Sequence, residues 1–271
     1  MMSEPGESFY DSVLITGASG GIGEEFARQL VFRCHQMILV ARRENRLRDL
    51  AADLRRQNPS LDVLFFVVDL TSAAEREKFL TMLLSNGAKP DLLINNAGMG
   101  DYRLFSDSEW EKIDSMMQVN MTALTHLTHS LIPQMRERGS GGGAIINVSS
   151  LASILPMPEF AVYAATKAYV TSFSEALRLE LKGDGIPVMA LCPGPVHTEF
   201  GSVAMPANAQ ELPGREMFYV DKSVVVEKAL RGLSRHKARV YPGWQVALAA
   251  AGISLLPLAV IRLVMSSRLR K

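Results

Sequence analysis

Tyr163 and Lys167 have the residue types and the spacing needed to transfer a proton. They lie four residues apart in a stretch, 160–182, whose pattern predicts a helix, so both side chains should project from one helix face. An ordinary tyrosine has a pKa of about 10 and is a reluctant base near neutral pH, but a neighbouring ammonium group would favour its phenolate. Ser150 precedes Tyr163 by thirteen residues, at the end of an apolar run, and could hydrogen-bond a reacting oxygen. Taken alone, a tyrosine and a lysine at this spacing on a helix would be interpreted as an exposed surface pair.

A glycine-rich turn offers a second kind of chemistry, the binding of phosphate. The segment from Thr16 to Gly23 reads TGASGGIG and follows the apolar run 13–16. Glycines permit a tight turn and close approach of the backbone to a ligand, and the free N–H groups of a following helix attract a pyrophosphate. Such a cluster can also be a flexible turn and no more. Its position between a predicted strand and a predicted helix favours the phosphate-binding interpretation.

Short apolar runs rich in β-branched residues alternate with longer amphipathic stretches along the chain. This alternation predicts a parallel sheet covered by helices on both faces, joined by right-handed crossovers. No shift in composition resembles a linker, so residues 1–271 are expected to form a single doubly wound α/β domain. Strands are expected at 13–16, 37–41, 63–68, 92–95, 144–148 and 188–191, and helices at about 22–33, 44–57, 73–86, 113–138, 160–182 and 221–234.

Five motifs occur in a fixed order: the turn Gly17-x-x-x-Gly21-x-Gly23, then Asn95-Asn96-Ala97-Gly98 after a strand, Ser150, Tyr163 and Lys167. Together they closely resemble the short-chain dehydrogenase/reductase superfamily, over residues 13–198. The resemblance implies a Rossmann-type doubly wound parallel sheet in three α/β/α layers. It also implies hydride transfer between a nicotinamide dinucleotide and a carbonyl or alcohol substrate. In that scheme Tyr163 exchanges a proton with the substrate oxygen, Ser150 orients that oxygen, and Lys167 holds the nicotinamide ribose.

The resemblance assigns a fourth catalytic residue, Asn120. In the family this position lies where a helix is locally opened and a chain of water reaches the lysine. The alternative is an ordinary polar residue on a long helix. Ser149 is the neighbour of Ser150 that the spacing does not select, and it is expected to be structural.

The residues after the second predicted strand favour NADP(H) over NAD(H). Dinucleotide folds that take NAD often carry an acid there for the ribose hydroxyls, whereas this chain has Arg42 and Arg43. An arginine can grip a 2′-phosphate, so NADP(H) is the expected cofactor and NAD(H) the alternative. The opposing interpretation is that these arginines only begin an Arg-rich, solvated helix. Some family members also carry a basic residue at the position of Gly20; that contact is missing here, and Ser19 is expected to contribute a hydroxyl instead.

Further cofactor contacts are implied by the resemblance at the ends of other strands. Asp69 would bond the adenine amino group, although it could equally cap a helix, and Asn95 is as readily a bridge between neighbouring strands as a cofactor contact. Thr198 ends a turn expected beside the nicotinamide carboxamide. The complete expected cofactor set is Gly17, Ser19, Gly21, Ile22, Gly23, Arg42, Arg43, Asp69, Leu70, Asn96, Ala97, Gly98, Tyr163, Lys167, Pro193, Gly194, Val196 and Thr198.

Two segments near the C-terminal end stand apart from these motifs. Residues 199–220 form a long stretch containing two prolines, expected to act as a mobile substrate lid rather than a mere surface excursion. The stretch 244–265 is the most apolar, yet Pro257 and Arg262 interrupt it. Two shorter helices packed on the substrate pocket or on a partner subunit are favoured over shallow membrane attachment and over a spanning helix. Its apolar character hints at an apolar substrate.

Composition narrows the class of protein. With 29 basic and 28 acidic residues the net charge is +1, so nothing indicates a nucleic acid partner. Cys34 and Cys192 are far apart and in no paired motif, which predicts neither a disulfide nor zinc. His126 and His129 have no third ligand nearby, so no metal is expected. The segment 1–10 has two glutamates and no apolar run, which argues against a leader and predicts a cytoplasmic location, with membrane association through the apolar stretch as the alternative.

The favoured function is the NADP(H)-dependent reduction of a ketone or a 3-oxoacyl thioester. Oxidation of an alcohol or a sugar by the same Tyr163 and Lys167 is the alternative. A third hypothesis is a dinucleotide sensor without turnover, because fold alone does not imply activity. The presence of Asn120 and Ser150 in addition to Tyr163 and Lys167 argues against a sensor without turnover. The resemblance also implies a homodimer or homotetramer, since many relatives pair through the helices that hold Asn120 and Tyr163.

Overall fold

A computed structural model describes residues 9–139, 142–205 and 216–266. It contains a seven-stranded sheet in the order β3-β2-β1-β4-β5-β6-β7, in which every neighbouring pair is parallel. The predicted strands are all present, and several are longer than expected. The strands are β1 (Tyr10–Thr16), β2 (Cys34–Ala41), β3 (Asp62–Val67), β4 (Leu92–Asn95), β5 (Ala144–Val148), β6 (Val188–Leu191) and β7 (Arg239–Val240).

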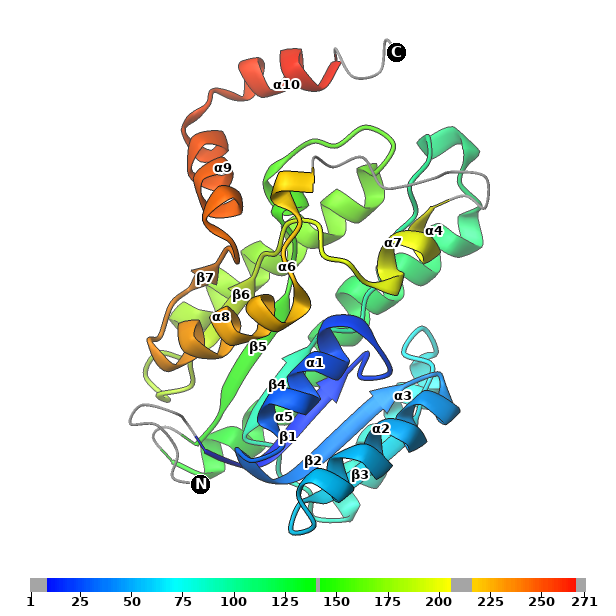
Figure 1. Cartoon of the computed structure of the whole chain (residues 1–271), viewed down its shortest axis with the longest axis vertical. Coiled ribbons are helices and arrows are strands. Elements are labelled where there is room, and N and C mark those ends of the chain that lie inside the picture. Colours follow the sequence, from blue (N-terminus) through cyan, green and yellow to red (C-terminus); the bar gives the residue numbers. More distant parts are fainter. Residues whose placement is uncertain (1–8, 140–141, 206–215, 267–271) are drawn as a thin grey trace.

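Helices cover both faces of this sheet (Figure 1). One apolar core lies between the sheet and α1, α2 and α8, and includes Phe26, Leu47 and Val225; a second lies against α3, α5 and α6 on the other face. Successive residues of β1 alternate between the two cores, as a strand buried on both sides must. The main helices are α1 (Gly21–Leu30), α2 (Glu44–Gln57), α3 (Ala73–Ser85), α4 (Trp110–Met117), α5 (Leu124–Glu137), α6 (Ala161–Glu180) and α8 (Lys222–Ser234). The chain is therefore a three-layer α/β/α Rossmann-like domain.

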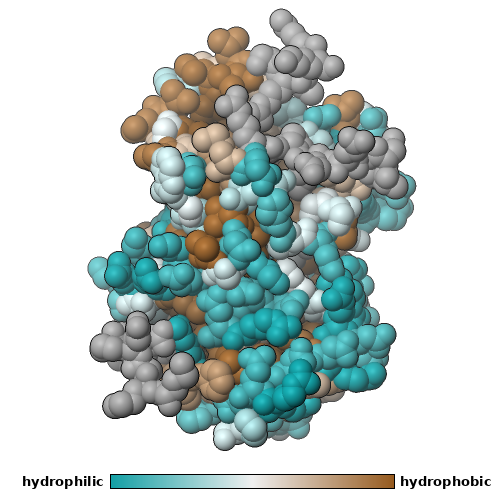
Figure 2. All heavy atoms as spheres, viewed as in Figure 1, coloured by the Kyte–Doolittle hydropathy of each residue, from teal (hydrophilic) through white to brown (hydrophobic). Residues whose placement is uncertain are grey.

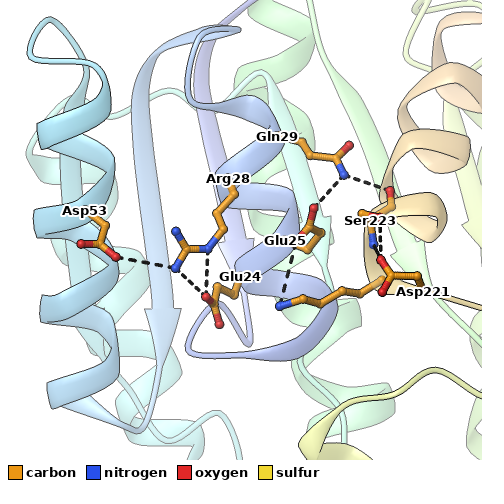
Figure 3. A network of polar contacts seen from close by, with 8 residues as sticks. Glu24, Glu25, Arg28, Gln29, Asp53, Asp221 and Ser223 are labelled. Atoms are coloured by element: carbon orange, nitrogen blue, oxygen red, sulfur yellow. Dashed lines mark hydrogen bonds and ion pairs between the residues drawn. The ribbon is translucent and has the colours of Figure 1, made fainter.

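Polar contacts join the three helices on the first face (Figure 3). Arg28 of α1 donates to Glu24 on its own helix and forms an ion pair with Asp53 of α2 at 3.7 Å. Gln29 donates to the backbone oxygen of Ser223 at the start of α8, 2.9 Å away. These surface pairs contribute little stability individually, but they fix α1, whose first turn follows the glycine-rich segment.

The predicted helix at 113–138 is interrupted. A wider, π-helical stretch at Gln118–Ala123 separates α4 from α5, and Asn120 lies within it. Such a bulge inserts one extra residue per turn and often marks a functional position. The pattern of apolar residues runs smoothly through this region and gives no sign of the interruption. The local opening of the helix at Asn120 that the resemblance implied is nevertheless confirmed.

The C-terminal apolar stretch forms two helices, α9 (Trp244–Leu255) and α10 (Leu258–Ser266), as expected from Pro257. Among the described residues, no single helix is long and apolar enough to span a membrane. The two helices together reach that length and composition, but they are bent by 117° at their junction. The expected lid contains α7 (Glu199–Ala204), and its residues 206–215 lie outside the described residues, as do 1–8, 140–141 and 267–271.

Candidate active site

The glycine-rich turn is shaped by contacts that leave no room for side chains. Gly17 has φ +65°, a left-handed conformation that favours glycine. A Cβ added to Gly23 would lie 2.4 Å from the Gly17 carbonyl oxygen and 2.5 Å from Asn96 Nδ2. That amide donates to the backbone oxygens of Thr16, at 2.9 Å, and Gly17, at 3.2 Å. Asn96 thus ties the end of β4 to the turn, a positioning role alongside its expected place beside the adenosine ribose.

Thr16 begins the glycine-rich segment, although it is not among the expected cofactor contacts. Its Oγ1 accepts hydrogen bonds from the backbone N–H groups of Asn96 and Ala97, both at 3.0 Å. Its side chain is buried at the carboxyl end of β1. One hydroxyl therefore sets the distance between two segments that are expected to contact the cofactor.

Arg43 is the arginine that faces the glycine-rich turn. Its Nε donates to Ser19 Oγ at 3.2 Å and its Nη2 to the Ser19 carbonyl oxygen at 3.0 Å. A Cβ added to Gly20 would lie 2.8 Å from Nη2, so the absence of a side chain at this position leaves space for the guanidinium against the turn. Arg42 is exposed, and no hydrogen bond or ion pair of the described residues involves it. Its expected grip on a 2′-phosphate stays a prediction, while Arg43 has a geometry suited to that role.

Asp69 follows β3 and forms a compact turn rather than a helix cap. Its Oδ1 accepts from the backbone N–H of Thr71 at 2.9 Å and from Thr71 Oγ1 at 2.8 Å. The cap of α3 is Ser72, so the alternative that Asp69 caps this helix is wrong, and its expected bond to the adenine stays a prediction. Buried Arg76 donates to the backbone oxygens of Leu70 and Thr71 at 2.6 and 3.0 Å. Arg76 fixes the turn assigned to the adenine, and nothing in the local pattern distinguished it from a surface arginine.

Ser150 and Tyr163 come together at the ends of β5 and α6. Tyr163 is buried and stacks on Phe160, with ring centroids 4.2 Å apart. Burial raises the pKa of Tyr163 to about 12, against the opposing effect of a hydrogen bond with Ser150. Ser150 Oγ also accepts from the backbone N–H of Ala152 at 3.1 Å, which fixes the hydroxyl. The phenol is therefore fully protonated near neutral pH and able to donate.

Lys167 lies one helical turn after Tyr163, with its Nζ 5.7 Å from the centre of the tyrosine ring. The Nζ donates to the Val148 carbonyl oxygen at 2.8 Å. Burial lowers the pKa of Lys167 to about 8, because water no longer solvates the ammonium group. A Cβ added to Gly98 would lie 3.4 Å from this Nζ. The ammonium group is thus placed between Tyr163 and the Asn96-Ala97-Gly98 segment.

Asn120 uses its side chain to join three segments. Its Oδ1 accepts from the Met99 N–H at 2.8 Å, and its Nδ2 donates to the Met99 oxygen at 3.0 Å and to Thr166 Oγ1 at 2.9 Å. Thr166 in turn donates to the Tyr163 backbone oxygen at 2.8 Å. The π-helical stretch is what turns this amide inward. The geometry shows a residue that positions the site, and its expected link to a water chain stays a prediction.

Two neighbouring polar residues are structural. Ser149 Oγ donates to the Lys167 backbone oxygen at 2.9 Å and shares a 2.7 Å hydrogen bond with Thr171, so it anchors α6 on β5. Asn95 Nδ2 donates to Asn147 Oδ1 at 2.8 Å and to Thr128 Oγ1 at 2.9 Å. The expected bridge between strands is present for Asn95, although it joins side chains rather than backbone.

The turn from Pro193 to Thr198 passes beside the glycine-rich segment. A Cβ added to Gly21 would lie 3.4 Å from Thr198 Cβ, and one added to Gly194 would lie 2.8 Å from Val246 Cγ2 of α9. Thr198 caps α7 by accepting from the Phe200 N–H at 3.4 Å. This turn therefore connects the expected cofactor site, the described part of the lid and the C-terminal helix.

The residues present fit a nicotinamide dinucleotide. Gly17 and Gly23 leave bare backbone at the start of α1, Arg43 supplies a cation beside it, and Lys167 lies at the other end of the same sheet edge. Ligands of doubly wound sheets bind at this carboxyl edge, near the point where the strand order reverses between β1 and β4. The residues that would hold the dinucleotide are those of the expected set gathered here.

Other candidate chemistries have no support in the described part of the chain. No cluster of three or more potential metal ligands occurs there, and His126 instead lies 3.5 Å from Glu77. Cys34 and Cys192 are both free and buried. Burial raises the pKa of the Cys34 thiol to about 12, so it is unreactive.

A parallel sheet with a glycine-rich turn, a buried tyrosine and a buried lysine defines a dinucleotide-dependent oxidoreductase of the Rossmann type. Residues 11–208 match the family model for the short chain dehydrogenases, adh_short. The chain therefore belongs to the short-chain dehydrogenase family, and the expected resemblance is confirmed.

Named relatives place it more closely among known proteins. It is 33% identical to 11-beta-hydroxysteroid dehydrogenase-like 2 of Arabidopsis thaliana, over 86% of this chain and 73% of the relative. The chain spans only 59% of a second plant relative, 11-beta-hydroxysteroid dehydrogenase-like 3. Among solved structures, a short-chain dehydrogenase from Sphingobium yanoikuyae in complex with NADPH has a TM-score of 0.79 and 33% identity, covering 94% of this chain and 95% of that one. A bulky-bulky ketone specific alcohol dehydrogenase from Comamonas testosteroni has a TM-score of 0.76 and 30% identity, covering 94% of each chain.

Proposed function

We propose that this protein is an NADP(H)-dependent reductase of an apolar ketone or other carbonyl compound. The observation that carries the proposal is the protonated, buried Tyr163, hydrogen-bonded to Ser150 beside the Lys167 ammonium group. When bound, the dinucleotide supplies the hydride. Ser150 holds the substrate oxygen, and Tyr163 gives its proton to that oxygen as negative charge develops there. The buried phenol holds its proton at neutral pH, which is the state that reduction of a carbonyl requires.

Aromatic and thioether side chains around Tyr163 support an apolar substrate. Phe160 and Tyr102 lie edge to face with centroids 5.5 Å apart, and Phe200 of α7 lies 5.5 Å from the Tyr163 ring. Met116 and Met99 pack against the same cluster. Such side chains shape a pocket by contact area rather than by directed hydrogen bonds, and methionines adapt to irregular ligands. The ketone named for the Comamonas testosteroni relative fits this description.

Arg43 supports NADP(H) as the preferred cofactor, with NAD(H) as the alternative. Its guanidinium lies on the glycine-rich turn, and Arg46 follows one turn later on α2. A planar guanidinium can donate two parallel hydrogen bonds to a phosphate. The NADPH bound to the Sphingobium yanoikuyae relative is in line with this choice. We also propose that the active form is a homodimer or homotetramer acting on a small-molecule substrate.

Replacing Arg43 with alanine should weaken NADPH binding about 10- to 100-fold, the effect of losing a charge-assisted pair of hydrogen bonds. NADH affinity should change by less than about threefold, because NADH lacks the phosphate. Fluorescence titration of the purified protein with both dinucleotides measures the two affinities. Arg48→Ala is the matched control, since this arginine of α2 is exposed and pairs with Glu44 rather than with the glycine-rich turn. Equal weakening of both dinucleotides by Arg43→Ala would remove the argument for NADP(H).

A further inference from the structure

Glu199, the first residue of α7, bridges two arginines that lie more than 150 residues away in the sequence. Its Oε2 accepts from Arg43 Nη1 at 2.5 Å, and its Oε1 accepts from Arg46 Nη2 at 2.9 Å. The carboxylate also lies over the glycine-rich turn, 3.5 Å from the position of a Cβ on Gly20. An acid thus stands at the place where the proposed cofactor presents its 2′-phosphate, although it comes from the lid and not from β2.

We propose that Glu199 competes with the 2′-phosphate for Arg43 and Arg46 and thereby sets the preference between NADP(H) and NAD(H). This inference rests on the proposed function. Three of the five N–H donors of the Arg43 guanidinium already have acceptors: Nε and Nη2 bond Ser19, and Nη1 bonds Glu199. A phosphate that binds the remaining N–H groups of Nη1 and Nη2 would lie against the Glu199 carboxylate, and the repulsion between the two anions would displace the carboxylate.

The ion pairs of Glu199 with the two arginines are weak enough for a phosphate to displace them. Hydrogen bonding from Arg43 holds the pKa of Glu199 below its usual value, so the carboxylate stays ionised at neutral pH. The side chains of Arg43, Arg46 and Glu199 are 48%, 57% and 50% exposed, and exposed ion pairs are weak. A phosphate carrying nearly two charges binds the same guanidinium groups more strongly than one carboxylate. The bridge therefore lowers the affinity for the phosphate without abolishing it.

Displacement of Glu199 would also affect the expected substrate pocket through the residue that follows it. The next residue, Phe200, lies against the Tyr163 ring, and a Cβ on Gly100 would lie 2.8 Å from Phe200 Cζ. Glu199 directly follows Thr198, which caps α7 and ends the turn expected beside the nicotinamide. Release of the bridge frees the first turn of α7 to move against the pocket, so the phosphate and the substrate are coupled through one short helix.

The test uses adenosine 2′,5′-bisphosphate and AMP as probes, since they differ by the phosphate in question and carry no nicotinamide. In Glu199→Gln, calorimetric titration should show about tenfold tighter binding of the bisphosphate and no change for AMP, because the charge is removed while the shape is kept. The NADPH-to-NADH affinity ratio should rise by the same factor. Glu44→Gln is the matched control: it removes an equal charge at the start of α2, where Glu44 pairs with Arg48 rather than with Arg43.

Unchanged or weaker binding of the bisphosphate to Glu199→Gln would overturn the competition, as would an equal gain in the Glu44→Gln control. The Arg43→Ala variant separates this result from a failure of the proposed function. If Arg43→Ala binds the bisphosphate as tightly as the unaltered protein, Arg43 is not the phosphate site and the NADP(H) proposal itself fails. If Arg43→Ala loses the bisphosphate while Glu199→Gln changes nothing, only the inference about Glu199 fails.

A second, independent observation concerns the surface of α9 and α10. Figure 2 shows hydrophobic residues gathered at the end of the molecule where these two helices lie. Leu255 is 86% exposed, Leu263 73% and Trp244 69%. Exposed apolar groups at this density mark an interaction surface. From Trp244 to Lys271 the sequence has no acidic residue, whereas it carries four basic ones, Arg262, Arg268, Arg270 and Lys271.

We infer that this surface docks on an anionic lipid bilayer. The exposed apolar side chains, with Arg262 among them and a sequence without acids, match the hydrocarbon boundary and the negative headgroups of such a bilayer. The 117° bend between α9 and α10 suits helices that lie in the interface. Docking here would let an apolar substrate reach the pocket from the membrane, since α9 contacts the Pro193–Thr198 turn through Val246.

Sedimentation with lipid vesicles tests the docking. The full chain should pellet with vesicles of phosphatidylcholine and phosphatidylglycerol, and the double variant Leu255→Ser, Leu263→Ser should bind about tenfold or more weakly, because two large apolar groups are lost. Leu179→Ser is the matched control, since Leu179 is 74% exposed on α6, outside this surface. Absence of binding to anionic vesicles would overturn the inference. So would a fall in oligomeric mass caused by the double variant without any vesicle binding, which would assign the surface to a second copy of the chain.

Discussion

Tyr163→Phe should lower turnover by a factor of about 10³ while leaving the affinity for NADPH within about twofold of its original value. The substitution removes one hydroxyl, the group that donates the proton. The ring keeps its stacking on Phe160, at 4.2 Å between centroids, and its contact with Phe200. The pocket therefore retains its shape and loses only the acid. Steady-state reduction of a panel of apolar ketones, monitored by NADPH oxidation, measures the loss.

Tyr169→Phe is the control for this variant. Tyr169 lies on the same helix and its hydroxyl shares a 2.8 Å hydrogen bond with Thr125 at the surface. It should keep nearly full turnover. Substantial turnover in Tyr163→Phe would show that another group donates the proton, and the assignment of Tyr163 would be withdrawn.

Lys167→Met should lower turnover by about 10²- to 10³-fold and, at neutral pH, raise thermal stability by a few degrees. The loss of activity follows from removing the positive charge beside Tyr163. The gain in stability has a separate cause. Burial lowers the pKa of this lysine from 10.5 to about 8, so at neutral pH the folded protein holds a poorly solvated charge. That penalty is on the order of 3 kcal/mol, partly offset by the hydrogen bond that Nζ donates to Val148.

The sign of the pH dependence follows from the same shift. Between pH 8 and pH 10.5 the unfolded chain binds the lysine proton and the folded chain does not. The free energy of unfolding contributed by Lys167 therefore rises with pH across this window and is lowest below it. In Lys167→Met that dependence should vanish. Reductive turnover of the unaltered protein should in turn decline above about pH 8, as the ammonium group loses its proton.

Chemical denaturation at several pH values, together with initial rates, measures both effects. Lys182→Met is the control: this lysine lies just beyond α6, is exposed, and should change neither quantity. A Lys167→Met variant that is less stable than the original at pH 7 would mean that the ammonium group stabilises the fold, contrary to the burial argument.

The sequence predicts most of the fold because its two strongest signals are local. Buried parallel strands appear as short apolar runs, and all six expected ones are present. The seventh, β7, has only two residues and lies at the edge of the sheet beside β6, so no run marks it. The break in the helix at Gln118–Ala123 has no signal in the apolar pattern, because the choice between α and π turns depends on what Asn120 can bond in the folded protein; only the resemblance to the family indicated it.

The same contrast holds in the site. Ser150, Tyr163 and Lys167 could be selected because their spacing matches that of the family, and the structure brings the three residues together. The phosphate-binding side could not be resolved to one arginine: Arg42 and Arg43 are adjacent, and only the packing of Ser19 against the guanidinium distinguishes them. Glu199 could not be anticipated at all, because the bridge spans the sheet edge between residues that are distant in sequence.

Gly20 limits which substitutions the phosphate-facing side of the expected cofactor site can accept. A side chain at position 20 and the guanidinium of Arg43 require the same space, since a Cβ would come within 2.8 Å of Nη2. A side chain at position 20 would therefore displace Nη2 from the Ser19 carbonyl oxygen, a shift that the flexible arginine side chain can make at low cost. A basic residue in the glycine-rich turn and an arginine after β2 in its present pose are thus coupled, because introducing the first requires the second to move. Substitutions at the two positions should have non-additive effects on phosphate affinity.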